Sequence, residues 1–166
     1  MIRRHYVTPS RGIALKFQGI IDLPELYKQM KMWLEDKGYA KANTVEKSYV
    51  EKVKPNGKQI EISWEGEKSI SDYFKYKIKV LFVLIGVNET EVQEEGVKRK
   101  LYKGNFQIYI SAYVEEGGDL WDSLGPLTKL YHNLVAKKRL QDCKSDLYDA
   151  MYSFQNFIRK FLEVRT

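Results

Sequence analysis

Histidine, cysteine and paired carboxylates are the side chains that most often carry chemistry in proteins, and this sequence has few of them. Its histidines are His5 and His132, and its one cysteine is Cys143. No two of these three residues have the spacing of metal ligands, and a single cysteine cannot form an internal disulfide, so we predict no metal site. We interpret His132 as a helix-surface or core histidine and Cys143 as a small helix residue without a redox role.

Other patterns associated with catalysis are missing or have a simpler explanation. The sequence contains no phosphate-binding loop, dinucleotide fingerprint or Gly-x-Ser-x-Gly nucleophile elbow. Glu61 and Glu65 lie on one face of a predicted strand and could form a carboxylate pair. Lysines of the next strand can sit opposite them, however, which makes ordinary cross-strand charge pairs the better explanation. The sequence therefore predicts no catalytic residue and no cofactor and favours a protein that is not an enzyme, while acid–base catalysis by Glu, Asp, Lys or Tyr stays open.

Basic residues are the next candidates, because the net charge is +6. Residues 1–16 contain no acid and account for four of the six excess positive charges. We predict a basic, flexible arm over residues 1–12 and a single α+β domain over residues 13–166. The candidate anion-binding residues come from this arm and from one face of a predicted strand: Arg3, Arg4, Lys75, Lys77 and Lys79. With Tyr109 and Tyr113 available to stack on bases, these residues make nucleic acid a possible partner.

The elements that would position these side chains are strands in the middle of the chain. Residues 74–84 and 106–114 carry apolar side chains at every second position, as a half-buried strand does. The connections between consecutive strands are too short for parallel crossovers, so we predict an antiparallel meander. We expect Gly86 to interrupt the central strand, and residues 87–95 to form a polar edge strand.

Helices are predicted on both sides of the strand region. Asp22 can cap a first helix, Pro24 fits its first turn, and Gly38 ends it. After residue 119 two apolar stripes at helical spacing run towards the C-terminus, the first through Leu127, Leu130, Tyr131, Leu134 and Val135. The phase of the pattern shifts between Ala136 and Ser145, so we predict a bend or break there, in one helix or between two, with Ser145 as a cap.

The fold class is therefore α+β, with an antiparallel meander sheet of about five to six strands, one N-terminal helix, and one or two C-terminal helices packed on one face. This order of elements resembles the helix-grip arrangement, in which a curved antiparallel sheet wraps a long C-terminal helix. The resemblance implies that the space between sheet and helix can hold an apolar ligand. The candidate residues for lining such a cleft are Trp64, Phe82, Phe106, Met151 and Phe154.

For function, we predict a non-catalytic binding or structural module. It would use the cleft for an apolar ligand, or an exposed aromatic face around Trp121, Tyr148 and Tyr152 for a protein partner or self-association. The alternative is a nucleic-acid-binding protein that uses the basic arm and the lysine and tyrosine face of the sheet. The sequence has no run of about 18 apolar residues and no apolar segment near its start, which predicts a cytoplasmic protein without membrane insertion.

Overall fold

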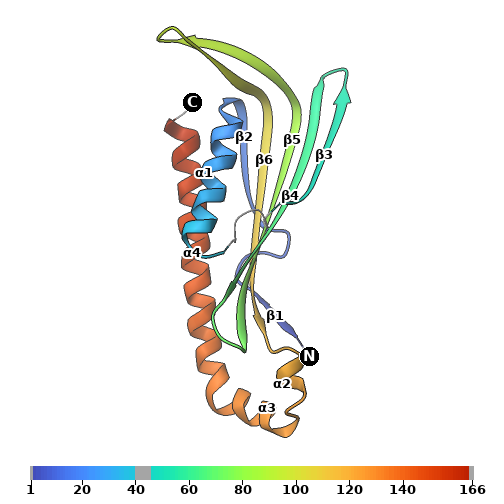
Figure 1. Ribbon diagram of the computed structural model, residues 1–166, viewed down its shortest axis with the longest axis vertical. Helices are drawn as coiled ribbons and strands as arrows, with labels where there is room; N and C mark the ends of the chain where they lie inside the picture. The colour runs from blue at the N-terminus through green and yellow to red at the C-terminus, as the bar shows by residue number, and fades with distance from the viewer. Residues whose placement is uncertain (1, 40–45, 165–166) are drawn as a thin grey trace.

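The computed structural model describes residues 2–39 and 46–164 and confirms the α+β class. A six-stranded antiparallel sheet carries helices along one of its faces (Figure 1). The strands are β1 (Arg3–Tyr6), β2 (Ile13–Ile21), β3 (Glu46–Lys54), β4 (Gly57–Ser69), β5 (Phe74–Glu94) and β6 (Val97–Glu116). The helices are α1 (Leu23–Asp36), α2 (Asp119–Asp122), α3 (Pro126–Tyr131), the π-helical segment η1 (His132–Ala136) and α4 (Lys137–Val164). Among the residues described, none of these helices combines the length and apolarity needed to cross a membrane.

The sheet has the order β1-β6-β5-β4-β3, and β2 also pairs with β6. β1 and β2 share one edge of β6, because β1 pairs with residues 113–116 and β2 with residues 102–110. The run from β3 to β6 is the antiparallel meander that the short connections predict. Residues 3–6 of the basic arm form β1 and are tied to the sheet by this pairing, whereas Met1 lies outside the described residues.

β5 continues past Gly86, the glycine expected to interrupt it, and pairs with β6 on both sides of this point. Gly86 has φ +64° and marks a bulge, with the register shifting between Ile85 and Asn88. Gly104 lies opposite, where an added Cβ would stand 3.1 Å from the Gly86 carbonyl oxygen. The expected separate strand over residues 87–95 is therefore the continuation of β5, and with β6 it forms a ribbon that arches beyond the rest of the sheet (Figure 1).

The core lies between the inner face of the sheet and helices α1 and α4. The even-numbered residues 74–84 of β5 and 106–114 of β6 are at most 3% exposed, as their alternation predicts. From α4 the core receives Leu140, Cys143, Leu147, Met151, Phe154 and Ile158. The rings of Trp33 in α1 and Phe154 in α4 stack at 4.6 Å, so the two helices also pack against each other.

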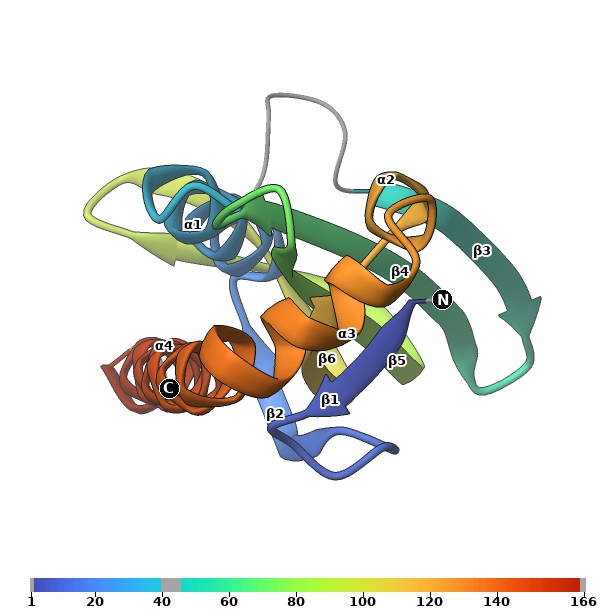
Figure 2. The same cartoon turned by 90° about the horizontal axis from the view of Figure 1, so that it is seen from below.

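The ends of α1 are those that the sequence predicts, whereas the start of α4 differs from the prediction. Asp22 caps α1 by accepting a hydrogen bond from the backbone N–H of Glu25, and Gly38 follows the last turn with φ +85°. The change of direction expected between Ala136 and Ser145 comes earlier, at η1. There the chain turns from α3, which crosses the lower end of the molecule, into α4 (Figures 1 and 2). Ser145 lies inside α4 and is not a cap, because the π-helical turn already absorbs the phase shift.

Candidate functional site

Glu116, the last residue of β6, brings together both histidines of the chain. The side chain is 1% exposed and accepts three hydrogen bonds. Oε2 accepts from Nε2 of His5 in β1 at 2.7 Å, and Oε1 accepts from the Tyr73 hydroxyl at 2.8 Å and from Nδ1 of His132 in η1 at 2.5 Å. One buried carboxylate therefore connects β1, the segment before β5 and η1.

The electrostatics of Glu116 follow from these contacts. Burial alone raises the pKa of a carboxyl group, but the hydrogen bonds from Tyr73, His5 and His132 outweigh it and hold the Glu116 pKa below its ordinary value. The pKa of Tyr73 is raised, first by burial and then by its hydrogen bond to the Glu116 carboxylate. The carboxylate is thus kept ionised and acts as the acceptor for all three neighbours.

We interpret the role of this cluster as structural, because it links β1, the segment before β5 and η1. Both carboxylate oxygens already accept hydrogen bonds and the side chain is almost fully covered, so little room remains for a substrate proton. The two imidazoles bind different oxygens of Glu116 and so do not converge on one point. In the described part of the chain, no group of three or more His, Cys, Asp or Glu side chains is placed to hold a metal ion.

A small pocket of about 270 Å³ adjoins the cluster. Its charged lining residues are Arg3, Glu116, Asp122, Lys129 and the ionisable His132. Positive and negative side chains are both present, so the pocket has no strong preference for one sign of ligand charge.

The region around Glu116 also contains three mutually packed aromatic rings. Tyr73 makes edge contacts with Trp121 of α2 and Tyr131 of α3, at 4.9 and 5.2 Å between ring centroids. Trp121 and Tyr131 stack at 5.0 Å, and the Trp121 indole N–H donates to the Asp72 carbonyl at 3.0 Å. Together with the hydrogen bond that His132 donates to Glu116, these contacts fix α3 and η1 against the end of the sheet.

The side of α3 and η1 that points away from these contacts is apolar. We call residues 124–136 the elbow. His132 and Ala136 face the protein, since His132 binds Glu116 and Ala136 is fully buried. The other side carries large apolar residues that are 41–74% exposed: Leu124, Leu127, Leu130, Leu134 and Val135. The predicted apolar stripe includes Leu127, Leu130, Leu134 and Val135, and the structure leaves these four side chains uncovered because the elbow lies at the lower extremity of the molecule (Figures 1 and 2).

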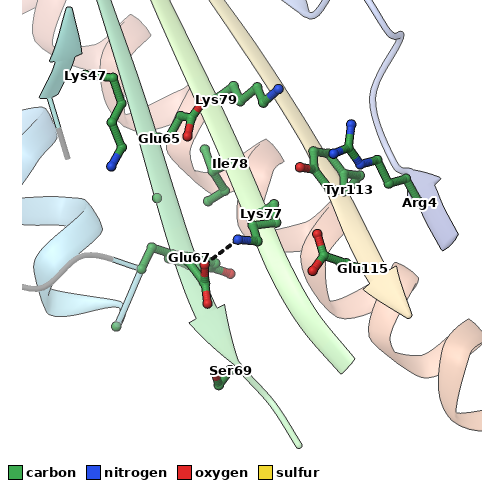
Figure 3. A pocket seen from close by; sticks show the side chains of 13 residues that line it. Arg4, Lys47, Glu65, Glu67, Ser69, Lys77, Ile78, Lys79, Tyr113 and Glu115 are labelled. Atoms are coloured by element: carbon green, nitrogen blue, oxygen red, sulfur yellow. Dashed lines mark hydrogen bonds and ion pairs between the residues drawn. The ribbon is translucent and has the colours of Figure 1, made fainter. Parts of the chain in front are cut away.

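The predicted anion-binding residues fall on two faces. Arg4, Lys77 and Lys79 line an open groove of about 720 Å³ on the outer face of the sheet, together with Lys47 of β3 (Figure 3). Arg3, the neighbour of Arg4 in β1, lines the small pocket beside Glu116 instead. Lys75 does not line the groove and forms an ion pair with Glu67 at 3.5 Å.

Within the outer groove, two cations share one aromatic ring. The guanidinium of Arg4 and the ammonium of Lys79 lie 5.2 and 5.9 Å from the centre of the Tyr113 ring. The described residues place no carboxylate at ion-pair distance from either cation. Three acidic residues also line the groove, Glu65, Glu67 and Glu115, so its charge is mixed.

The register places a lysine opposite Glu65, as predicted, but not opposite Glu61, and the ion pairs in this region are made by Glu67. Glu67 binds Lys77 as well as Lys75, and the hydrogen bond from Lys77 holds the Glu67 pKa below its ordinary value despite partial burial. Glu65 stands opposite Lys79 in the β4–β5 register, and Glu61 stands opposite Val83.

The five predicted cleft residues lie inside the packed core. Their exposures are 0–2%, and none of them lines the small pocket or the outer groove: Trp64, Phe82, Phe106, Met151 and Phe154. Trp64 and Phe82 touch edge to face at 4.8 Å, and Phe154 is covered by Trp33 of α1. These aromatic contacts fill the space between sheet and α4 with the protein's own side chains.

Sequence reasoning missed Glu116, although a signal for it exists. Residue 116 is the next even position after the buried series 106–114 in β6, so the alternation places this carboxylate on the core face. A buried carboxylate needs hydrogen-bond donors, and both histidines of the chain donate to Glu116.

Neither models of known protein families nor the curated proteins match this sequence.

Proposed function

We propose that this chain is a non-catalytic binding module that docks onto its partner through the elbow. The observation that supports this proposal is the exposure of the apolar row. Leu127, Leu130 and Leu134 are 62, 54 and 74% exposed and are spaced to share one side of the helix. A row of large apolar side chains facing water marks a surface that is covered in the functional state.

The elbow is also held in place before any partner arrives. Glu116, Tyr73 and Trp121 fix its inner side by hydrogen bonds and ring contacts. A preformed surface loses little conformational entropy on binding, which favours recognition. The filled core between sheet and α4 supports the elbow as the docking surface in preference to an internal cleft.

Hydrophobic-interaction chromatography tests whether the elbow is the dominant exposed hydrophobic surface of the protein. The test variant is L127S/L134S, which replaces two exposed leucines of the row. We expect it to elute from a phenyl matrix earlier than the unmodified protein, at a higher salt concentration, with its unfolding temperature unchanged because both positions are exposed.

The matched control is V53S/L81S, which replaces two apolar residues that are 80 and 41% exposed on strands β3 and β5. Scattered exposed apolar side chains are ordinary, so this variant should elute close to the unmodified protein. Equal or larger shifts in the control would show that the elbow is not the docking surface.

Nucleic-acid binding is the second candidate, favoured by the two cations on Tyr113. Arg4 and Lys79 come from distant parts of the sequence, yet both lie within 6 Å of this ring without a carboxylate at ion-pair distance among the described residues. On a heparin matrix, R4Q/K79Q should elute at clearly lower salt than K98Q/K100Q, which removes two exposed lysines near the far end of the β5–β6 ribbon. Equal elution of the two variants would assign any retention to overall charge.

A further inference from the structure

We propose that the partner of the elbow is the surface of an anionic lipid bilayer. This inference rests on the proposed docking role of the elbow and adds the chemistry of what the elbow meets. It concerns a protein lying on a membrane surface with its leucines among the headgroups and the first carbons of the acyl chains, with no segment spanning the bilayer.

The first argument is charge. Between Ser123 and Gln141 the sequence contains no acidic residue and four basic ones: Lys129, Lys137, Lys138 and Arg139. All four are exposed. Exposed leucines next to exposed cations are the composition of helices that lie at the interface of anionic membranes.

The second argument is the direction in which these cations lie relative to the leucines. Ala136 and Leu140 mark the buried side at the start of α4, and Lys138 falls midway between them on the opposite side. Leu134 lies one helical turn before Lys138 and is 74% exposed. A surface that covers Leu134 would therefore also meet the ammonium group of Lys138.

The third argument is shape. The elbow is a protruding end of an elongated molecule, and α3 is the part nearest the viewer when the molecule is seen from below (Figures 1 and 2). A stable protein interface usually covers about 800 Å² on each partner and needs a broad complementary surface. A protruding end with a row of leucines suits shallow penetration into a soft bilayer better than it suits such an interface.

Flotation of the protein with lipid vesicles tests the proposal. One set of vesicles contains equal parts of phosphatidylcholine and phosphatidylglycerol, and the other contains phosphatidylcholine alone. We expect the protein to float with the anionic vesicles and to remain largely unbound with the neutral ones, and high salt should weaken the binding.

Two variants separate the apolar and the electrostatic contributions. L127S/L134S should lower the partition coefficient on the order of a hundredfold, as loss of two leucines from the acyl boundary implies. K137Q/K138Q should lower it by about 25-fold, at about fivefold for each cation. K98Q/K100Q removes the same charge from the β5–β6 ribbon, and V53S/L81S removes apolar groups elsewhere, so both should bind like the unmodified protein.

The outcomes distinguish failure of this inference from failure of the proposed function. If the protein binds neither kind of vesicle while L127S/L134S still changes retention on the phenyl matrix, the elbow docks but its partner is a protein. If K98Q/K100Q loses as much vesicle binding as K137Q/K138Q, binding follows net charge and the elbow is not the lipid contact. If the phenyl-matrix test also fails, the elbow has no docking role.

Discussion

Replacing Glu116 should weaken the fold more than replacing any surface carboxylate, because three donors depend on it. E116A would leave the Tyr73 hydroxyl, in a side chain only 5% exposed, without its acceptor, which costs about 1–3 kcal/mol. His5 and His132 are partly exposed and can form hydrogen bonds with water instead. Losing their hydrogen bonds to Glu116 therefore costs less stability than losing those of a fully buried ion pair. We expect a total of about 3–4 kcal/mol, which lowers the unfolding temperature by about 10 °C in a protein of this size.

E116Q separates the charge of this residue from its shape. The amide oxygen can still accept from Tyr73, so we expect a smaller loss of about 1–2 kcal/mol. Because the Glu116 pKa is lowered in the folded protein, its stabilising contribution is fully present above the ordinary carboxyl pKa of 4.5 and is lost as the pH falls through the native value. The difference in unfolding free energy between the unmodified protein and E116Q should therefore shrink below pH 4.5.

Urea unfolding followed by tryptophan fluorescence, from neutral to acidic pH, measures both effects. Arg3, Asp122 and Lys129 line the adjoining pocket and are the same in both proteins, so their contributions to stability largely cancel in the difference. E115A is the matched control, since Glu115 directly precedes Glu116 in β6, lines the outer groove and forms no ion pair with another described residue. A loss of stability in E116A no larger than in E115A would refute the role given to Glu116.

Three further predictions concern the core, the cysteine and the bulge. F154A should lower the free energy of unfolding by about 3–5 kcal/mol in urea titrations, because Phe154 is fully buried against Trp33, and a change below about 1 kcal/mol would contradict the packed core. Cys143 is 8% exposed and burial raises its thiol pKa, so a thiol reagent should label it slowly in the native protein and rapidly in urea; fast native labelling would contradict this burial. G104A should destabilise by about 1–3 kcal/mol in the same unfolding assay, since its Cβ would stand 3.1 Å from backbone atoms of Ile85, Gly86 and Val87, and an unchanged free energy of unfolding would contradict this close approach.

The alternation of apolar residues was sufficient to predict strands and the face that enters the core, and the short connections predicted their antiparallel pairing. Residues 74–84 and 106–114 are buried at every second position because a strand with one covered face requires it. The caps of α1 were also predictable, since Asp22 and Gly38 act through local geometry. The bulge at Gly86 was not, because a glycine in a strand fits both an interruption and a bulge.

The candidate sites depended on pairing across long sequence separations, which residue patterns do not contain. His5 lies 111 positions from Glu116, and the two meet only because β1 pairs with the end of β6. Arg4 reaches Tyr113 through the same pairing. The exposure of the elbow was hidden for a different reason: helical periodicity identifies an apolar side, but it cannot tell whether that side meets the sheet or extends past its end.

The pairing of β1 with β6 changes how the basic arm should be tested. Removing residues 1–12 to measure anion binding would also remove His5, and with it one of the three donors to Glu116. It would uncover the edge of β6 at residues 113–116 as well, leaving backbone groups there without their partner strand. Loss of heparin binding in such a truncation would therefore combine lost charge with a loosened elbow. R4Q leaves His5 and the strand pairing intact, and H5A removes one donor to Glu116 without changing the arginines. The two variants therefore test anion binding by the outer groove and anchoring of the elbow by Glu116 separately.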